Sequence, residues 1–282
     1  MGQFGNQLEY LLGVLDFATQ LNRTLVLPPF IFISDKGDFF LRPFQNVFNV
    51  SLLANYIKTP VVTLDDFKKE MPMNNCTLVC SLSSKCFNRV QEPDITFWHS
   101  LDVSQCRIRR HDLSFSLTDQ WISGFSDHIL VFPNAPANYP ALAKDYHYQQ
   151  HLVWTNELLN TVPKMSKPYL GVHLRRGSDM LATCRSAFHE VKPLFSEAYN
   201  CPDSLHRPLE MCYQSLEEIL RTLILTIKNY HFKSVYLACD TNCHDVEEGL
   251  QKAMPSLFVK RPLEALVFTD IIALDTSDVF LE

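Results

Sequence analysis

The second half of the chain alternates short apolar runs with longer amphipathic segments. Strand-like runs lie at 169–175, 234–240, 257–262 and 278–282, and helical patterns at 210–232, 244–254 and 264–274 separate them. Strands that alternate with helices need crossover connections, which produce parallel sheets. Helical periodicity also follows Gly5 and spans 148–160, with shorter strand-like runs between. The sequence therefore predicts an α/β fold built on parallel sheets.

Size and charge bound the function. The 282 residues carry a net charge of -6, so no basic surface for nucleic acid is indicated. No stretch reaches the roughly 18 consecutive apolar residues of a membrane span. We expect a monomeric enzyme-sized protein that binds no nucleic acid and has no membrane span.

Nine cysteines and three Asn-x-Ser/Thr sequons, at Asn22, Asn49 and Asn75, occur together. This combination favours an oxidising, glycosylating compartment. The cysteines contain no CxxC pair of the kind that holds structural zinc. Residues 72–126 show little periodicity, so we expect loops and short strands there, held by at least one disulfide.

The stretch "GVHLRRGSD" places His173 and Arg175 at the carboxyl end of a predicted strand. Ligands of open α/β sheets bind at this edge, and an arginine there can contact phosphate oxygens with several donors. The alternative reading gives Arg176 a surface salt bridge and His173 an ordinary internal partner.

Two other stretches resemble parts of such a site. In "MGQFGNQ", Gly2 and Gly5 allow a ligand to approach the start of a helix, and Asn6 either caps that helix or reaches the ligand. In "SVYLACDT", Asp240 follows an apolar strand and can accept hydrogen bonds from a guanine or a ribose, or can cap the next helix.

The order of "MGxFGNQ", "LNRTL…PP", "APA.YP", "GVHLR.GSD" and "SVY.A.D" resembles the protein O-fucosyltransferase 1 family over nearly the whole chain. That family attaches fucose to Ser or Thr of EGF-like repeats. The resemblance implies a GT-B-like fold of two facing Rossmann-type domains, expected at 1–175 and 176–282, with GDP-fucose in the cleft. It also implies an inverting, GDP-fucose-dependent peptide O-fucosyltransferase.

The resemblance assigns roles to particular residues. It makes Arg175 the main catalytic residue, bonded to the β-phosphate oxygens, with Asn6 as a second catalytic residue. The donor-binding residues that it implies are Gln3, Phe4, Gly5, Asn6, His173, Leu174, Arg175 and Asp240, and the disulfides are Cys80 with Cys86 and Cys184 with Cys212. Gln3 stands where the family usually has an arginine, and Met180 where a tryptophan is more familiar.

The same resemblance suggests partners and a location. The acceptors are EGF-like repeats of secreted or cell-surface proteins such as Notch-type receptors, and the location is the lumen of the endoplasmic reticulum. The family's signal peptide, final helix and retention signal lie outside this sequence, so we expect a chain truncated at both ends. No DxD triplet occurs, and we expect no metal or other cofactor.

Two alternatives remain open. One is a catalytically impaired relative that binds EGF-like repeats as a chaperone-like protein, which Gln3 and the missing end favour. The other is an unrelated Rossmann-type enzyme that uses a nicotinamide or another nucleotide, which the absence of a GxGxxG fingerprint disfavours.

Overall fold

A computed structural model describes most of the chain. The described residues are 4–33, 39–71, 75–81, 101, 103–111, 128–133, 135–138, 140–178, 180–182, 184–185, 213–240, 243–260, 267–275 and 277–281. Contacts divide the chain into two compact units, Met1–Thr155 and Asn156–Glu282. The division falls after Thr155 and not after residue 175, because the strand Tyr169–Leu174 pairs with strands of the second unit.

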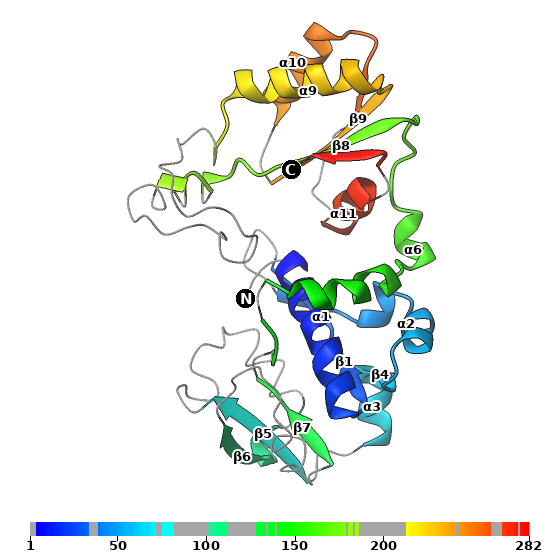
Figure 1. The fold of residues 1–282 in the computed structure, drawn as a ribbon, viewed down its shortest axis with the longest axis vertical. Helices are drawn as coiled ribbons and strands as arrows, with labels where there is room; N and C mark the ends of the chain where they lie inside the picture. The colour runs from blue at the N-terminus through cyan, green and yellow to red at the C-terminus, as the bar shows by residue number, and fades with distance from the viewer. Residues whose placement is uncertain are drawn as a thin grey trace. The chain divides into compact units, whose positions relative to one another are not determined.

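The second unit is a four-stranded parallel sheet in the order β10-β9-β8-β11. Its strands are β8 (Tyr169–Leu174), β9 (Ser234–Cys239), β10 (Phe258–Lys260) and β11 (Val279–Leu281). The helices α9 (Leu216–Tyr230) and α10 (His244–Ala253) cover one face, and α11 (Val267–Asp275) lies on the other (Figure 1). The predicted α/β architecture with parallel strands is confirmed.

The core of this unit follows the alternation of side chains along each strand. Leu170 and Val172 of β8 pack with Val235 and Leu237 of β9 in the cluster beneath α9 and α10. Tyr169 of β8 and Tyr236 of β9 point to the opposite face, where they pack with Ala273 of α11. Both faces of the sheet are therefore buried, as is typical of parallel sheets.

Helix α9 shows why the sequence signal was strong. Ser215 caps the helix by accepting a hydrogen bond from the backbone N–H of Glu218. Ile219, Leu223 and Ile227, each four residues apart, are buried on one face of the helix. The apolar spacing and the cap together specify this helix locally.

In the first unit, α1 (Phe4–Leu21) begins the chain of elements. The strands β1 (Leu25–Leu27) and β4 (Val61–Thr63) pair in parallel, and β2 (Phe30–Ile33) and β3 (Phe39–Arg42) form an antiparallel pair that the sequence analysis did not predict. Short helices follow at η1 (Phe44–Asn46), α2 (Val50–Tyr56) and α3 (Leu64–Glu70).

A second parallel sheet in this unit has the order β6-β5-β7. Its strands are β5 (Cys76–Ser81), β6 (Arg107–His111) and β7 (Ile129–Val131), and η2 (Val103–Gln105) precedes β6. A disulfide joins Cys76 to Cys106, next to Leu78 and Val131 in the same buried cluster. The expectation of at least one disulfide between residues 72 and 126 is thus confirmed.

The predicted helix over 148–160 is wrong. The structure has a 3-10 segment η3 (Ala143–His151), an extended stretch, and then the short helix α6 (Asn156–Leu159). In the extended stretch, Trp154 forms an isolated antiparallel β-bridge with Phe48, and the centroids of their rings lie 4.6 Å apart. Because Thr155 N–H also donates to the carbonyl of Val47, pairing with the earlier segment prevails over the local helical pattern.

No helix within the described ranges is long and apolar enough to cross a membrane.

Two glycines of α1 provide a matched test of its packing. A Cβ built on Gly13 would lie 2.7 Å from the Cβ of Ala137, whereas one on Gly5 would meet nothing within 4 Å. Both changes replace glycine by the residue with the higher helix propensity. We expect Gly13→Ala to lower the free energy of unfolding by about 1–3 kcal/mol through overpacking, and Gly5→Ala to leave it unchanged or raised. Denaturant titration measures both, and equal stability of the two variants would contradict the close packing.

Candidate functional site

The carboxyl ends of β8 and β9 meet at one edge of the second unit's sheet. The two strands are paired in parallel with Leu174 opposite Cys239, and Asp240 N–H donates to the carbonyl of Leu174. Arg175 and Asp240 are therefore the first residues beyond two adjacent strands. The structure brings these two predicted site residues to the same sheet edge, where ligands of α/β proteins bind.

The carboxylate of Asp240 is held by the backbone of the turn that follows β8. Its Oδ1 accepts from Arg176 N–H at 2.8 Å, and its Oδ2 accepts from Gly177 N–H at 3.0 Å. Asp240 is exposed, and each carboxylate oxygen keeps a second acceptor position. Asp240 thus has a defined partner within the protein and further capacity toward a ligand.

Arg175 and Arg176 have different surroundings. Arg175 is exposed at the strand end, while the half-buried Arg176 donates from Nη1 to Oδ2 of Asp245 at 2.9 Å. Partial burial acts to raise the pKa of the Asp245 carboxyl, but the hydrogen bond and charge of Arg176 outweigh it, so the pKa lies below its usual value. The salt-bridge reading of Arg176 is confirmed.

His173 and Leu174 complete the end of β8 and point to opposite faces of the sheet. Leu174 is buried in the cluster beneath α9 and α10. His173 lies half-buried on the α11 face, two residues beyond Gly171, where an added Cβ would lie 2.7 Å from Oγ of Ser277. Of the two, only His173 is placed to present a polar side chain near the sheet edge.

A buried polar pair lies beneath this edge, between β9 and α11. The hydroxyl of Tyr236 donates to Oδ1 of Asp270 at 2.7 Å. Burial raises the pKa of the Asp270 carboxyl, and the hydrogen bond from Tyr236 and the charge of nearby His173 only partly offset this. Burial and the pairing with Asp270 also raise the pKa of Tyr236.

In the first unit, the start of α1 is fixed by an aromatic cluster. Phe4 is 1% exposed, and its ring lies 4.8 Å from Phe30 and 6.1 Å from Trp154, centroid to centroid. Because α1 is described from Phe4 onward, Gly5 and Asn6 lie within its first described turn, and Asn6 is not the cap. Gly5 is exposed and Asn6 half-exposed, beside N–H groups of the kind that attract anions.

Two side chains just inside α1 hold it to neighbouring segments. Gln7 donates from Nε2 to the carbonyl of Ile31 at 2.7 Å and accepts from Ile31 N–H at 2.9 Å. Glu9 accepts from Ala141 N–H at 2.8 Å and from the hydroxyl of Tyr146. These bonds hold α1, whose first turn carries "FGNQ", against the chain that directly follows "APA.YP".

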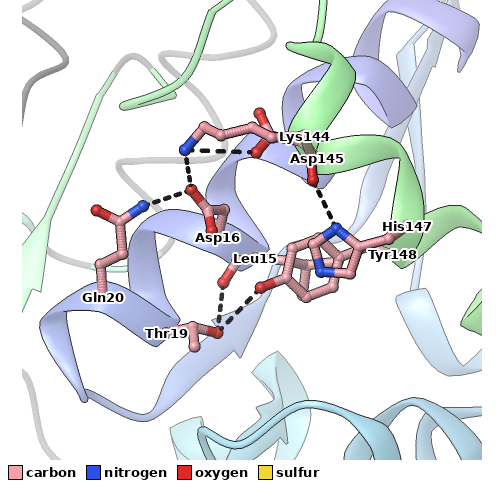
Figure 2. A network of polar contacts seen from close by, with 8 residues as sticks. All are labelled: Leu15, Asp16, Thr19, Gln20, Lys144, Asp145, His147 and Tyr148. Atoms are coloured by element: carbon pink, nitrogen blue, oxygen red, sulfur yellow. Dashed lines mark hydrogen bonds and ion pairs between the residues drawn. The ribbon is translucent and has the colours of Figure 1, made fainter.

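A polar network ties the second half of α1 to η3 (Figure 2). Lys144 pairs with Asp16 and lies 3.7 Å from Asp145, whose side chain is only 5% exposed. The hydrogen bond that Lys144 donates to Asp16 raises the pKa of Lys144, and burial raises the pKa of Asp145. At neutral pH, Lys144 is thus the cation between two carboxyl groups.

Several predicted residues fall outside the described residues or are only partly tested. Gln3 lies outside the described residues, and so do Cys86 and Cys212. Cys80 and Cys184 are both disulfide-bonded, but because their expected partners are not described, the two pairings stay predictions. A disulfide that the sequence analysis missed joins Cys239 to Cys243. The CxxxC spacing was its only signal.

No cluster of three or more His, Cys, Asp or Glu side chains that could hold a metal ion occurs among the residues the structure describes.

Comparison with known proteins identifies the fold and the family. The chain is similar to a crystal structure of POFUT1 in complex with GDP-fucose, with 26% identity, a TM-score of 0.83, and coverage of 99% of this chain and 87% of that one. A POFUT1 apo-form gives 25% identity and a TM-score of 0.82, covering 99% of this chain and 88% of that one. GDP-fucose protein O-fucosyltransferase 1 of Caenorhabditis elegans is 27% identical over 317 residues, covering 100% of this chain and 80% of the relative.

The parallel sheets and this likeness define a GT-B-like α/β fold, as the sequence predicts. The family model described as GDP-fucose protein O-fucosyltransferase matches residues 1–281. The chain belongs to this family.

The Lys144 network predicts a pH-dependent change in stability. In Lys144→Met, Asp16 and the buried Asp145 lose their shared cation, and we expect the free energy of unfolding to fall by about 1–2 kcal/mol at pH 7. Because the pKa of Asp145 is raised, its carboxyl takes up a proton as the pH falls before an unfolded carboxyl does, so the loss should shrink at pH 4. Denaturant titration at both pH values measures this.

Lys69→Met is the matched control, because the Lys69–Asp66 pair is exposed, with side chains 73% and 57% accessible. We expect it to change stability little at either pH. A loss in Lys144→Met that is the same at pH 4 as at pH 7 would contradict the role given to Lys144.

Proposed function

We propose that this chain transfers fucose from GDP-fucose to Ser or Thr hydroxyls of EGF-like repeats, with inversion at the anomeric carbon. The observation that carries the proposal is an arginine, Arg175, directly after a buried parallel strand in a chain whose residues 1–281 match the family. The likeness to POFUT1 bound to GDP-fucose supports the donor. The acceptor class follows from the resemblance in sequence.

Arg175 supplies the positive charge that the reaction needs. As the bond between fucose and the β-phosphate breaks, the sugar gains oxocarbenium character and negative charge grows on the leaving diphosphate. A guanidinium stays protonated at every physiological pH and offers several donors to phosphate oxygens. Because Arg175 supplies this charge and the sequence has no DxD triplet, we propose that transfer requires no metal ion.

Other residues are proposed to bind the donor. The carboxylate of Asp240 can accept further hydrogen bonds besides those from Arg176 and Gly177. This capacity suits binding of an N–H or O–H group of the nucleotide. His173 lies at the same strand end as Arg175. In the first unit, Phe4 fixes the first turn of α1, so that Gly5 and Asn6 are proposed to contact the donor, with Asn6 orienting reacting groups.

Removing the guanidinium of Arg175 should slow transfer severely. We expect Arg175→Ala to lower kcat by about 100-fold or more, the usual cost of losing one preorganised donor to developing charge, while circular dichroism and thermal unfolding stay unchanged. Arg175→Lys keeps the charge but not the fork of donors, and should recover only part of the rate. The assay measures labelled fucose transferred from GDP-fucose to a folded EGF-like repeat in the presence of EDTA.

Arg221→Ala is the control, because Arg221 on α9 forms an exposed ion pair with Glu218. Near-native turnover in Arg175→Ala would overturn the assignment. Selective binding of GDP-fucose and of an EGF-like repeat without any transfer would instead support the impaired, chaperone-like relative that Gln3 favours.

We further propose that the protein resides in the lumen of the endoplasmic reticulum and acts as a monomer. Cys76, Cys106, Cys239 and Cys243 form disulfides, which indicates an oxidising compartment.

The three sequon asparagines are exposed, which suits glycosylation in that compartment. They are Asn22, Asn49 and Asn75. Asn49 caps α2 through its Oδ1, so a glycan on Nδ2 leaves the cap intact. We expect a chain expressed through the secretory pathway to lose mass on treatment with an N-glycosidase. Replacing all three asparagines with glutamine should remove that loss, and an untreated mass equal to the bare polypeptide would contradict the proposal.

A further inference from the structure

The turn after β8 is held from three directions. Asp240 accepts from the N–H groups of Arg176 and Gly177, and the hydroxyl of Tyr213 donates to the carbonyl of Arg176 at 3.0 Å. The Arg176 side chain reaches Asp245 in the first turn of α10 at 2.9 Å. The backbone on both sides of Arg175 is therefore fixed, because Leu174 belongs to the sheet ladder.

The two carboxylates in this arrangement come from one short segment that is closed on itself. The Cys239–Cys243 disulfide joins the end of β9 to the residue before α10. Asp240 lies inside the closed loop, and Asp245 lies two residues after Cys243, where the loop ends. Closing so short a loop restricts where both carboxylates can lie relative to β8.

Stability alone does not account for the Arg176–Asp245 pair. The side chains are 22% and 42% exposed, and ion pairs with that much exposure contribute little. The Nε of Arg176 is buried with no hydrogen-bond partner among the described residues, which carries a desolvation cost. What the pair does provide is a fixed position for the backbone next to Arg175.

We propose that Asp240 and Arg176 are positioning residues that hold the turn 175–177 so that the Arg175 guanidinium is preorganised for the leaving diphosphate. This inference rests on the proposed function, and it gives Asp240 a task besides contact with the nucleotide. Preorganisation matters here because a flexible arginine that must be ordered during the reaction loses much of its effect on the rate.

A charge swap between Arg176 and Asp245 tests the proposal. We expect Arg176→Asp to lower kcat by about tenfold, with the KM for GDP-fucose changed by less than about threefold, because the donor is still bound but Arg175 is misplaced. The double variant Arg176→Asp/Asp245→Arg restores the ion pair and should return kcat to within about threefold of the unmodified protein. Arg221→Asp makes the same charge change at the exposed Glu218 contact, and should leave kcat unchanged.

A different pattern would overturn the proposal. If Arg176→Asp raises KM while kcat stays the same, and the double variant gives no recovery, Arg176 binds the donor directly and does not act through Arg175.

Hydrogen exchange provides a readout that does not depend on activity. The amides of Arg176 and Gly177 should be protected in the unmodified protein and should lose that protection in Asp240→Ala, whereas the Val172 amide inside the sheet keeps it. If the unmodified protein transfers no fucose, the proposed function fails. The exchange experiment alone then decides whether Asp240 holds the turn 175–177. Unchanged protection at both amides in Asp240→Ala would show that Asp240 does not hold this turn, even in an active enzyme.

Discussion

The parallel pairing of β8 with β9 is the interaction on which the site depends. With Leu174 opposite Cys239, the chain leaves both strands at the same level, so Asp240 meets the N–H groups of Arg176 and Gly177. A shift of this register by one residue would turn every side chain of β8 to the other face. The buried cores on both sides of the sheet therefore fix the place of Arg175.

In the first unit, packing and hydrogen bonds likewise fix the backbone next to exposed residues. Phe4 anchors the first turn of α1 in an aromatic cluster, and Gln7 pairs with the backbone of Ile31. Farther along the helix, Lys144 balances Asp16 and Asp145. These contacts leave Gly5 exposed and Asn6 half-exposed on an anchored helix, the kind of regular element on which the proposed donor contacts could be built.

The sequence predicts those parts of the molecule whose signals are local. The strands at β8 and β9 read as apolar runs, and α9 shows Ile219, Leu223 and Ile227 at helical spacing. The β2–β3 pair was missed because "FIFI" is apolar throughout and follows two prolines, so it shows no alternation. The extended segment at Trp154 was misread because its partner Phe48 lies far away in the sequence.

The candidate site divides in the same way. Arg175 and Asp240 could be placed at the ends of their strands from sequence, because parallel strands share one ligand-binding edge. The partners of Asp240 could not be predicted, since they are backbone N–H groups that no residue type reveals. The Tyr236–Asp270 pair depends on where α11 packs, and the Cys239–Cys243 disulfide on how β9 leads into α10.

A crystal structure of this chain with GDP would show whether Arg175 contacts the diphosphate. We expect the Arg175 guanidinium within about 3 Å of the β-phosphate oxygens, with Asp240 still accepting from the N–H groups of Arg176 and Gly177. A diphosphate bound elsewhere, with Arg175 directed into solvent, would contradict it.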